Sequence, residues 1–539
     1  MSAAARSFPR LGYASASWML LGTGIVAFVA ADLKIGALHP QADLLRLLGG
    51  LLHPDVFAIE GMALVHTIAF AVLGVALGGT AGLLLSLVFA KSRAVRMLCA
   101  FLRSIHELFW ALLLLQITGL SPLTGVLAIA LPYAGIFAKV YGEMIEEADL
   151  AAVRALPAGA STVSAFAYAR LPPLLKPFSD YALYRLECGL RSTLVLGFIG
   201  LPTIGFNLDS FFKQGRYAQA AALLGCFYAL VATRRLWARP ATLPLLLIAS
   251  LFLLPTGPGG GLAVDNLARF LGHDIVPFPL RGADLASLET WANAASWFWR
   301  IFAHQILPGA VQTLIVSQAA LAGMALLSLI LFPLVCRRFA GRIGRPLGRA
   351  ALVIARSTPE YMLAYVLLQT LGPSMLPAII ALSLHNGAVV GYLLGRHADA
   401  LDYRPDAPRR RADLYFYEVL PRLYGQFLAY VLYRWEIILR ESAIFGILGV
   451  TTLGFYVDGA ISELKLDVAL VLALATAGLS MSVDTLSRRL RATLRIGELP
   501  VRLSAERAIS PMESEAASSF DSAWRNSRAL GAKPVDELH

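Results

Sequence analysis

LPPLLKPFSDYALYRLECGLRSTLVLGFIGLPTIGF, residues 171–206, has a second copy in the same chain, LPRLYGQFLAYVLYRWEIILRESAIFGILGVTTLGF, residues 420–455. The two stretches align without a gap, and 16 of their 36 positions are identical. Both begin with Leu-Pro, continue with Leu-Tyr-Arg-x-Glu, carry a further arginine and share three glycines at the same spacing. Similarity at this level indicates that the chain contains one structural unit twice.

The composition is that of a helical membrane protein. Of the 539 residues, 57% are hydrophobic and only 15% are charged, and the mean hydropathy is +0.66. Apolar runs of 18 or more residues recur along the chain, and such a run can cross the roughly 30 Å hydrocarbon core of a bilayer. The length alone would favour several soluble domains, but the composition excludes that interpretation.

The net charge of +11 indicates membrane orientation rather than nucleic-acid binding. The basic residues cluster in short connections between apolar runs, as in the cytoplasmic loops of membrane proteins. No run combines basic and aromatic residues as a single-strand binding surface would. The cysteines lie in or beside apolar runs without metal-ligand spacing, and we interpret them as packing residues. They are Cys99, Cys188, Cys226 and Cys336.

These patterns predict an all-α polytopic protein with about 12 transmembrane helices and with both termini in the cytoplasm. Predicted spans in the first half are residues 13–31 (an uncleaved first helix), 62–90, 105–118, 123–144, the helix of the first copy and 217–233. Those in the second half are residues 241–254, 306–335, 352–371, 376–394, the helix of the second copy and 466–486. The aromatic residues between Trp291 and Trp299 predict a helix in the outer headgroup region before the eighth span.

The repeat defines the expected domains. An N-terminal helix and outside loop (1–61) precede the first repeat (62–239). A linking helix and outside segment (240–305) then precede the second repeat (306–496). The polar tail (497–539) is expected to be disordered. The repeat includes Arg103-Ser-Ile-His-Glu107 and Arg356-Ser-Thr-Pro-Glu360. Two six-helix halves of the same orientation place a pseudo-twofold axis along the membrane normal, where a substrate pathway would lie.

Two predicted cytoplasmic segments that end in Leu-Pro are candidates for docking a soluble partner. In the first, Gly159, Ala160 and Ser161 precede Leu171 and Pro172; in the second, Arg409 and Arg410 precede Leu420 and Pro421. The alternative is an ordinary connecting loop. The sequence has no Gly-x-x-x-x-Gly-Lys-Ser/Thr motif, so any ATP hydrolysis would belong to a partner. We find no enzyme signature and predict no catalytic residue, metal or cofactor in the chain itself.

At these segments the chain resembles a known family. Ala155-Leu-Pro-Ala-Gly159-Ala-Ser161 with Leu171-Pro172 is similar to the cytoplasmic EAA loop of type I ABC importer permeases. Arg103-Ser-Ile-His-Glu107-Leu-Phe-Trp-Ala-Leu112 and Tyr181-Ala-Leu-Tyr-Arg185-Leu-Glu187 look like the permease of phosphonate importers. The resemblance covers both halves as a fused pair. It implies an inner-membrane permease for phosphonate or a related phosphorus oxyanion, with ABC ATPase subunits (expected to be a homodimer) and a periplasmic or lipid-anchored binding protein as partners.

Both coupling segments depart from the family pattern. Arg154 occupies the position of the expected acidic residue, and Pro408 occupies the position of the second glycine, with an arginine run after it. We therefore expect the two contacts with the ATPases to be unequal.

Ionisable residues in the predicted spans are candidates for the translocation pathway, because a charge within the bilayer is costly and usually faces protein or water. They are Arg103, Glu107, Glu187, Arg191, Glu360, Glu436 and Arg440. Each copy has a glutamate and an arginine four residues apart, which can meet on one helix face. Guanidinium groups bind oxyanions well, which favours an inward-facing role for Arg191 and Arg440. Arg185 and Glu187 could instead lie at the cytoplasmic rim.

The favoured function is the fused transmembrane subunit of a binding-protein-dependent importer. An ion-coupled secondary transporter, which would need mid-membrane carboxylates and no ATPase, and an ABC permease for a different small solute are the alternatives. Glu441 stands where the first copy has Ser192, so the two halves would line a pathway unequally. The shared glycines, such as Gly197 and Gly446, permit either a helix bend or close packing.

Overall fold

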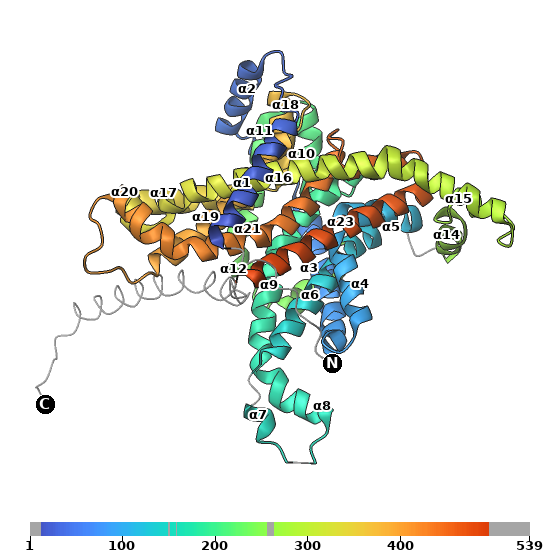
Figure 1. Ribbon diagram of the computed structural model, residues 1–539, viewed down its shortest axis with the longest axis horizontal. Coiled ribbons are helices and arrows are strands. Elements are labelled where there is room, and N and C mark those ends of the chain that lie inside the picture. The colour runs from blue at the N-terminus through green and yellow to red at the C-terminus, as the bar shows by residue number, and fades with distance from the viewer. Residues whose placement is uncertain (1–11, 149–150, 158, 256–263, 495–539) are drawn as a thin grey trace, which may run out of the picture.

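The computed structural model describes residues 12–148, 151–157, 159–255 and 264–494. Every regular element in these ranges is a helix, as Figure 1 shows. Six helices are long and apolar enough to cross a membrane, or up to nine if each of three bent pairs counts as one span. The all-helical class is confirmed, whereas the count of 12 spans is not. The predicted disordered tail lies outside the described residues.

The order of helices repeats along the chain. The first half contains α3 (Gly61–Phe89), α4 (Arg93–Ser104), α5 (Glu107–Thr118), α6 (Pro122–Glu146), α9 (Leu171–Leu196), α10 (Ile204–Lys213) and α11 (Tyr217–Ala232). The second half contains, in the same order, α16 (Leu307–Leu331), α17 (Arg337–Ser357), α18 (Glu360–Leu371), α19 (Leu376–Asp399), α21 (Leu420–Ser442), α22 (Leu453–Ser462) and α23 (Leu466–Thr493). The duplication seen in the sequence therefore extends to the local structure of both halves.

The third predicted span is only the second arm of a sharply bent helix pair, and the ninth, residues 352–371, contains the bend of another. The angle is 94° between α4 and α5 and 90° between α17 and α18. Each bend falls in the Arg-Ser-x-x-Glu motif, where His106 caps α5 by accepting from the Leu108 amide at 3.2 Å and Pro359 caps α18. A proline cannot donate a backbone hydrogen bond, and its ring excludes a continuous helix at that point.

One long helix differs from the prediction. We expected an interfacial helix followed by a separate span, but α15 (Leu288–Ile301), η6 (Phe302–Ile306) and α16 form one continuous 48-residue unit to Val335, visible as a single rod in Figure 1. No glycine or proline lies between Leu288 and Leu307 to break it. At 1.5 Å per residue such a rod is about 72 Å long, more than twice the thickness of a hydrocarbon core.

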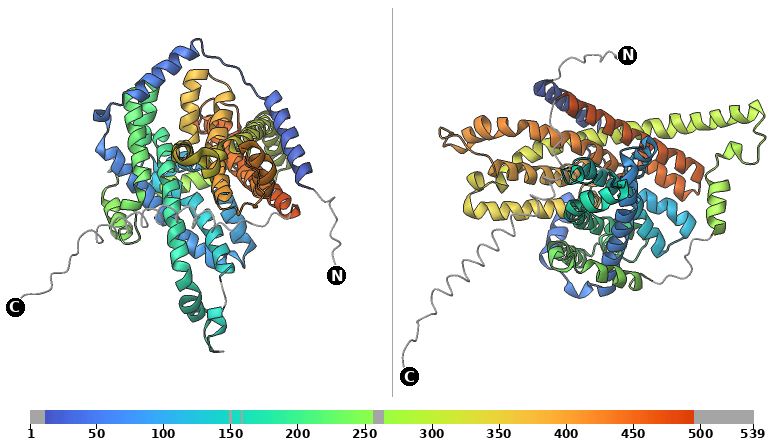
Figure 2. Two further views of the ribbon diagram at one scale, coloured as in Figure 1. Left: turned by 90° about the vertical axis from the view of Figure 1, so that its left-hand side faces the viewer. Right: turned by 90° about the horizontal axis from the view of Figure 1, so that it is seen from below.

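Small residues bring the central helices of each half close together. A methyl group on Gly78 would lie 2.8 Å from the β-carbon of Tyr133 on α6, and one on Gly387 of α19 would lie 2.9 Å from that of Leu327 on α16. Close approach of this kind is the usual way in which helices associate in lipid. α1 (Tyr13–Ala30) and α2 (Pro40–Leu52) lie at the periphery of this bundle (Figure 2).

The glycines of the duplicated stretch serve both purposes that the sequence left open. Gly200 and Gly449 follow the ends of their helices with φ of +93° and +88°, a left-handed conformation that a side chain disfavours. A β-carbon on Gly205 would overlap the carbonyl group of Leu194, and one on Gly454 would overlap that of Ala443. The corner from α9 to α10, and its equivalent from α21 to α22, thus needs glycine for the turn and for the packing.

The corner yields a first prediction. Gly205→Ala should lower the free energy of unfolding by about 3 kcal/mol, because the added methyl group overpacks a site that has no space. The change is measured as a lower thermal unfolding temperature of the full chain in detergent. Gly225→Ala in α11 is the matched control: its β-carbon would meet nothing within 4 Å, so that variant should be as stable as the parent. Equal unfolding temperatures for the two variants would contradict the packing argument.

Candidate functional site

The deep arginines of the duplicated stretch make reciprocal contacts between the halves. Arg191 of α9 donates to the backbone carbonyl of Arg356 at 3.4 Å, and Arg440 of α21 donates to that of Arg103 at 2.7 Å. Arg103 and Arg356 occupy the same position of the repeat, just before the bends. Helix ends leave carbonyl groups without an intrahelical partner. Each long helix therefore supports the bend of the opposite half.

The two motif glutamates lie beside these arginines. Glu107 accepts from the Ser192 hydroxyl at 2.7 Å, and Arg440 of the other half is close enough to interact with it electrostatically. Glu360 has the same relation to Arg191. The sequence prediction that these residues lie inside the protein and not on a lipid-facing surface is consistent with this arrangement.

His385 of α19 joins this centre through a defined tautomer. Its Nδ1 lies 2.9 Å from the carbonyl oxygen of Thr358, and its Nε2 lies 3.3 Å from Arg191. The carbonyl can only accept and the guanidinium can only donate, so the ring carries its proton on Nδ1. The imidazole is therefore a neutral link between α9 and the bend at Thr358.

A second contact between the halves has no counterpart across the repeat. The Arg103 side chain donates to Glu436 of α21 at 2.8 Å and to Asp484 of α23 at 2.7 Å, and Asp484 also pairs with Arg488 at 2.9 Å. We refer to these four residues as the Arg103 cluster. The side chain of Arg103 is 13% exposed and that of Asp484 only 5%, so the cluster is largely shielded from solvent.

The two equivalent residues, Glu187 and Arg356, do not contact each other, and each interacts within its own half. Glu187, the counterpart of Glu436, pairs with Arg234 at 3.5 Å, and Arg356, the counterpart of Arg103, lies 4.6 Å from the centre of the Tyr392 ring. The predicted pairing of each glutamate with the arginine four residues later was wrong, because Glu187 and Glu436 bind these other cations.

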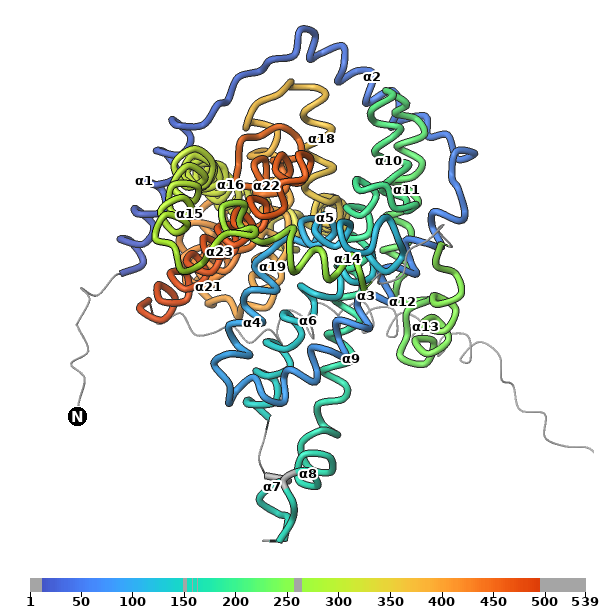
Figure 3. The backbone as a smooth tube through the Cα atoms, turned by 90° about the vertical axis from the view of Figure 1, so that its right-hand side faces the viewer, coloured from blue at the N-terminus to red at the C-terminus, as the bar shows by residue number. Residues whose placement is uncertain are grey.

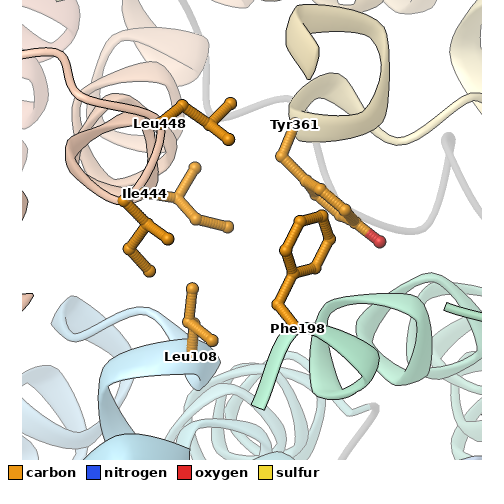
Figure 4. Close-up of a pocket in the computed structure, with 6 residues that line it drawn as sticks. Leu108, Phe198, Tyr361, Ile444 and Leu448 are labelled. Carbon is orange, nitrogen blue, oxygen red and sulfur yellow. The ribbon is translucent and has the colours of Figure 1, made fainter. Parts of the chain in front are cut away.

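An apolar group closes the space between the halves next to the ionisable centre. Six side chains surround a cavity of about 10 Å³: Leu108, Phe198, Tyr361, Ile444, Ile447 and Leu448. Figure 4 shows them converging from α5, from η3 (Gly197–Ile199), from α18 and from η9 (Ala443–Gly446) with the turn that follows it. The volume holds at most about one water molecule. We call these six residues the apolar plug.

Comparison with known proteins identifies the family. The chain is 30% identical over 246 residues to the phosphite transport system permease protein PtxC of Stutzerimonas stutzeri, and the match covers 87% of that protein and 41% of this chain. The chain belongs to the permease family of phosphonate and phosphite ABC importers. It is also 26% identical over 509 residues to the phosphate-import permease protein PhnE of Mycolicibacterium smegmatis, covering 87% of this chain and 93% of that protein. No protein-family model and no solved structure matches the chain.

The permease presents its two predicted coupling segments at the start of α9 and α21. Gly159, Ala160 and Ser161 form the turn before α8 (Thr162–Ser164), and the Ser161 hydroxyl caps that helix by accepting from the Ser164 amide at 3.1 Å. Leu171 and Pro172 then open α9 without a break. Figure 3 shows this segment extending away from the helical body.

The second coupling segment has the same local structure but is held more firmly. α20 (Arg411–Asp413) and η8 (Leu414–Val419) lead into Leu420 and Pro421 at the start of α21, as α8 and η2 (Ala165–Arg170) lead into α9. Arg409 and Arg410 are exposed just before α20. Buried Glu418 pairs with Arg422 at 2.7 Å, and the Tyr415 ring stacks on Phe332 at 5.2 Å.

Several partners in the permease centre could not be predicted from the sequence. Asp484 was not predicted, although an acidic residue in an apolar helix, four residues before an arginine, is unusual enough to be singled out. Ser192 and Asn386 carry no charge, so only the structure shows that they link charged groups. The predicted pathway residues are thus brought together, but mainly as ties between the halves.

The Arg103 cluster yields a second prediction. Arg103→Gln should lower the free energy of unfolding by about 3 kcal/mol, because Glu436 and Asp484 would stay shielded without their shared cation. Arg356→Gln, at the same position of the other half, removes no carboxylate partner and should have a smaller effect on the thermal unfolding temperature. The exchange Arg103→Glu with Glu436→Arg should recover part of the loss. Equal losses in the two single variants would argue against the asymmetric tie.

Proposed function

We propose that the chain is the fused transmembrane subunit of an importer that moves a phosphorus oxyanion across the inner membrane by alternating access, driven by two ABC ATPase subunits. The relatives are described as permeases for phosphite and phosphate, which supports an oxyanion of this class. A binding protein on the outer face would deliver the substrate.

One observation carries the ATPase part of this proposal. Each coupling segment exposes a large aromatic side chain at the same position of the repeat: Tyr168 is 81% exposed and Tyr417 is 77% exposed. Both lie in a single widened helical turn directly before the long helix. Exposed tyrosines are frequent anchors of protein interfaces. Force applied at Tyr168 or Tyr417 would act directly on α9 or α21, the helices that hold the opposite bends through Arg191 and Arg440.

The geometry supports a transport cycle in which the halves separate at the apolar plug. Leu108 and Tyr361 stand next to Glu107 and Glu360, whose surroundings include the arginines that cross between the halves. A movement of α9 relative to α21 would change the arginine-to-carbonyl contacts and the plug together. The proposed cycle requires no covalent chemistry from the permease.

The second candidate is an ion-coupled secondary transporter. Three shielded carboxylates, Glu107, Glu360 and Glu441, lie near the centre, which is the arrangement such a transporter would need. Each of them, however, lies beside an arginine. The exposed coupling tyrosines have no role in this alternative, which is why we favour the ATP-driven cycle.

The coupling tyrosines yield a third prediction. Tyr168→Ser and Tyr417→Ser should each lower co-purification of the ATPase and ATP-driven phosphite uptake by about tenfold, since loss of an interface anchor costs about 1.4 kcal/mol or more. The measurement uses the permease co-expressed with an ABC ATPase subunit that co-purifies with the parent chain. The anchored second segment predicts the smaller loss for Tyr417→Ser.

The control for the coupling tyrosines is an exposed aromatic residue on the predicted opposite side of the membrane. Phe57→Ser changes an aromatic side chain that is 97% exposed in the predicted outside loop, and it should leave ATPase binding intact. Uptake that persists in ATP-depleted vesicles under an ion gradient would overturn the ATP-driven cycle in favour of the secondary transporter.

A further inference from the structure

The two halves contain the same chain of polar contacts, which ends differently in each. In the second half, Arg434 donates to Asn386 at 3.1 Å, and Asn386 donates to the carboxylate of Glu441 at 3.2 Å. The arginine is thus linked to a carboxylate through one amide side chain. This three-residue chain links Arg434 to a carboxyl group of its own half.

In the first half, the equivalent positions hold Arg185, Tyr133 and Ser192. Arg185 lies 4.4 Å from the centre of the Tyr133 ring, and the Tyr133 hydroxyl lies 3.4 Å from that of Ser192. The serine hydroxyl continues to Glu107, but that glutamate already lies beside Arg440 of the other half. At the position that Glu441 occupies in the second half, the first half has the uncharged Ser192.

Two of the repeated arginines, Arg185 and Arg356, face aromatic rings rather than carboxylates. Of the others, Arg191 and Arg440 lie beside Glu360 and Glu107, Arg434 is linked to Glu441, and Arg103 pairs with Glu436 and Asp484. Among the described residues, no ion pair joins Arg185 to a carboxylate, and its surroundings are the phenol groups of Tyr133, Tyr181 and Tyr184. The positive charge of Arg185 therefore has no carboxylate beside it.

The Arg185 side chain also has an unused donor. Its Nε is buried and has no hydrogen-bond partner; the same is true of the Arg440 Nε, but that guanidinium group already donates to the Arg103 carbonyl. A buried donor without a partner is rare in folded proteins and calls for an explanation. Tyr184, the next residue, is 41% exposed although it lies within electrostatic range of Arg185, Arg191 and Arg434. Exposed phenol surface therefore adjoins the unpaired guanidinium group.

We propose that Arg185, with the phenol groups of Tyr133 and Tyr184, binds the transported phosphorus oxyanion on its way through the permease. This inference rests on the proposed function and adds a specific residue to it. A tetrahedral oxyanion accepts several hydrogen bonds at once and matches the planar guanidinium fork. It would supply both the missing negative charge and the missing acceptor. Arg191 and Arg440, which the sequence favoured, are already committed to backbone carbonyls and glutamates.

The competing explanation is purely structural. The contact between Arg185 and Tyr133 is a cation–π interaction, and such contacts stabilise folds without any ligand. The two explanations differ in their response to a charge placed at Ser192. A carboxylate there copies the second half, neutralises Arg185 and competes with an anionic substrate, yet it should support the arginine structurally.

The test measures uptake of radiolabelled phosphate, with unlabelled phosphite as competitor, in cells that express the permease together with its neighbouring ATPase and binding protein. Arg185→Gln should reduce uptake by about 30-fold, the loss expected when hydrogen bonds to a charged group are removed. Arg185→Lys should retain part of it, with a raised KM. Arg434→Gln is the matched control, because that arginine already has a side-chain partner in Asn386, and its loss should stay below about threefold.

Ser192→Glu is the variant that separates the two explanations. Because Ser192 is buried and donates to Glu107, a second carboxylate there lowers the thermal unfolding temperature somewhat. We expect uptake to fall by about tenfold or more in protein that still co-purifies with the ATPase, and to fall further than in Ser192→Gln, which adds similar bulk without the charge. Uptake at the parental level in Arg185→Gln or in Ser192→Glu would overturn the assignment. Equal losses in Arg185→Gln and Arg434→Gln would also overturn it. Absence of phosphate and phosphite uptake by the parent permease would instead contradict the proposed function, so the two failures are distinguishable.

Discussion

The rest of the structure depends on two hydrogen bonds that cross between the halves, from Arg191 to the carbonyl of Arg356 and from Arg440 to the carbonyl of Arg103. Each holds the bend of one half with the long helix of the other. A guanidinium group can satisfy a helix-end carbonyl and remain near a glutamate at the same time. The bends place Leu108 and Tyr361 at the apolar plug. The closed conformation is therefore built from helices that cannot move independently of the opposite half.

On this repeated frame the two halves have diverged in charge. Arg103 reaches across to Glu436 and Asp484, whereas Glu187 takes Arg234 from its own half. The coupling segments differ in the same sense: the second is tied down through Glu418 and Arg422, and the first extends freely (Figure 1). The backbone repeats closely, and the functional differences lie in a small number of side chains. The asymmetry expected from the departures at Arg154 and Pro408 thus has structural counterparts, although in other residues.

Much of the fold could be predicted from the sequence because helix periodicity, glycine spacing and the internal repeat are local signals. The boundaries of α1, α3 and α6 agree with the predicted ranges to within a few residues, whereas the helices of the two copies end before those stretches do, at Leu196 and Ser442. The right-angle bends could not be predicted, since they depend on the capping of α5 and α18 in three dimensions. The sequence predicted which ionisable residues lie in the site, but not which of them form ion pairs with one another. Which cation Glu187 or Glu436 would bind depends on contacts between distant helices. Only the structure shows that Arg185 combines aromatic surroundings with a buried Nε that has no hydrogen-bond partner.

Because the two repeats are fused in one chain, the net charge at the centre of the permease need not be an even number. In a permease built from two identical chains, every ionisable group near the axis occurs twice, so the central charge can change only in steps of two. In a single chain, Ser192 and Glu441 can differ, and the difference changes the total by one. A site with an odd charge, matched to one anion, is thus accessible to a fused protein and closed to a symmetric one. Joining the halves relaxes a symmetry constraint, beyond any advantage of making both halves from one gene.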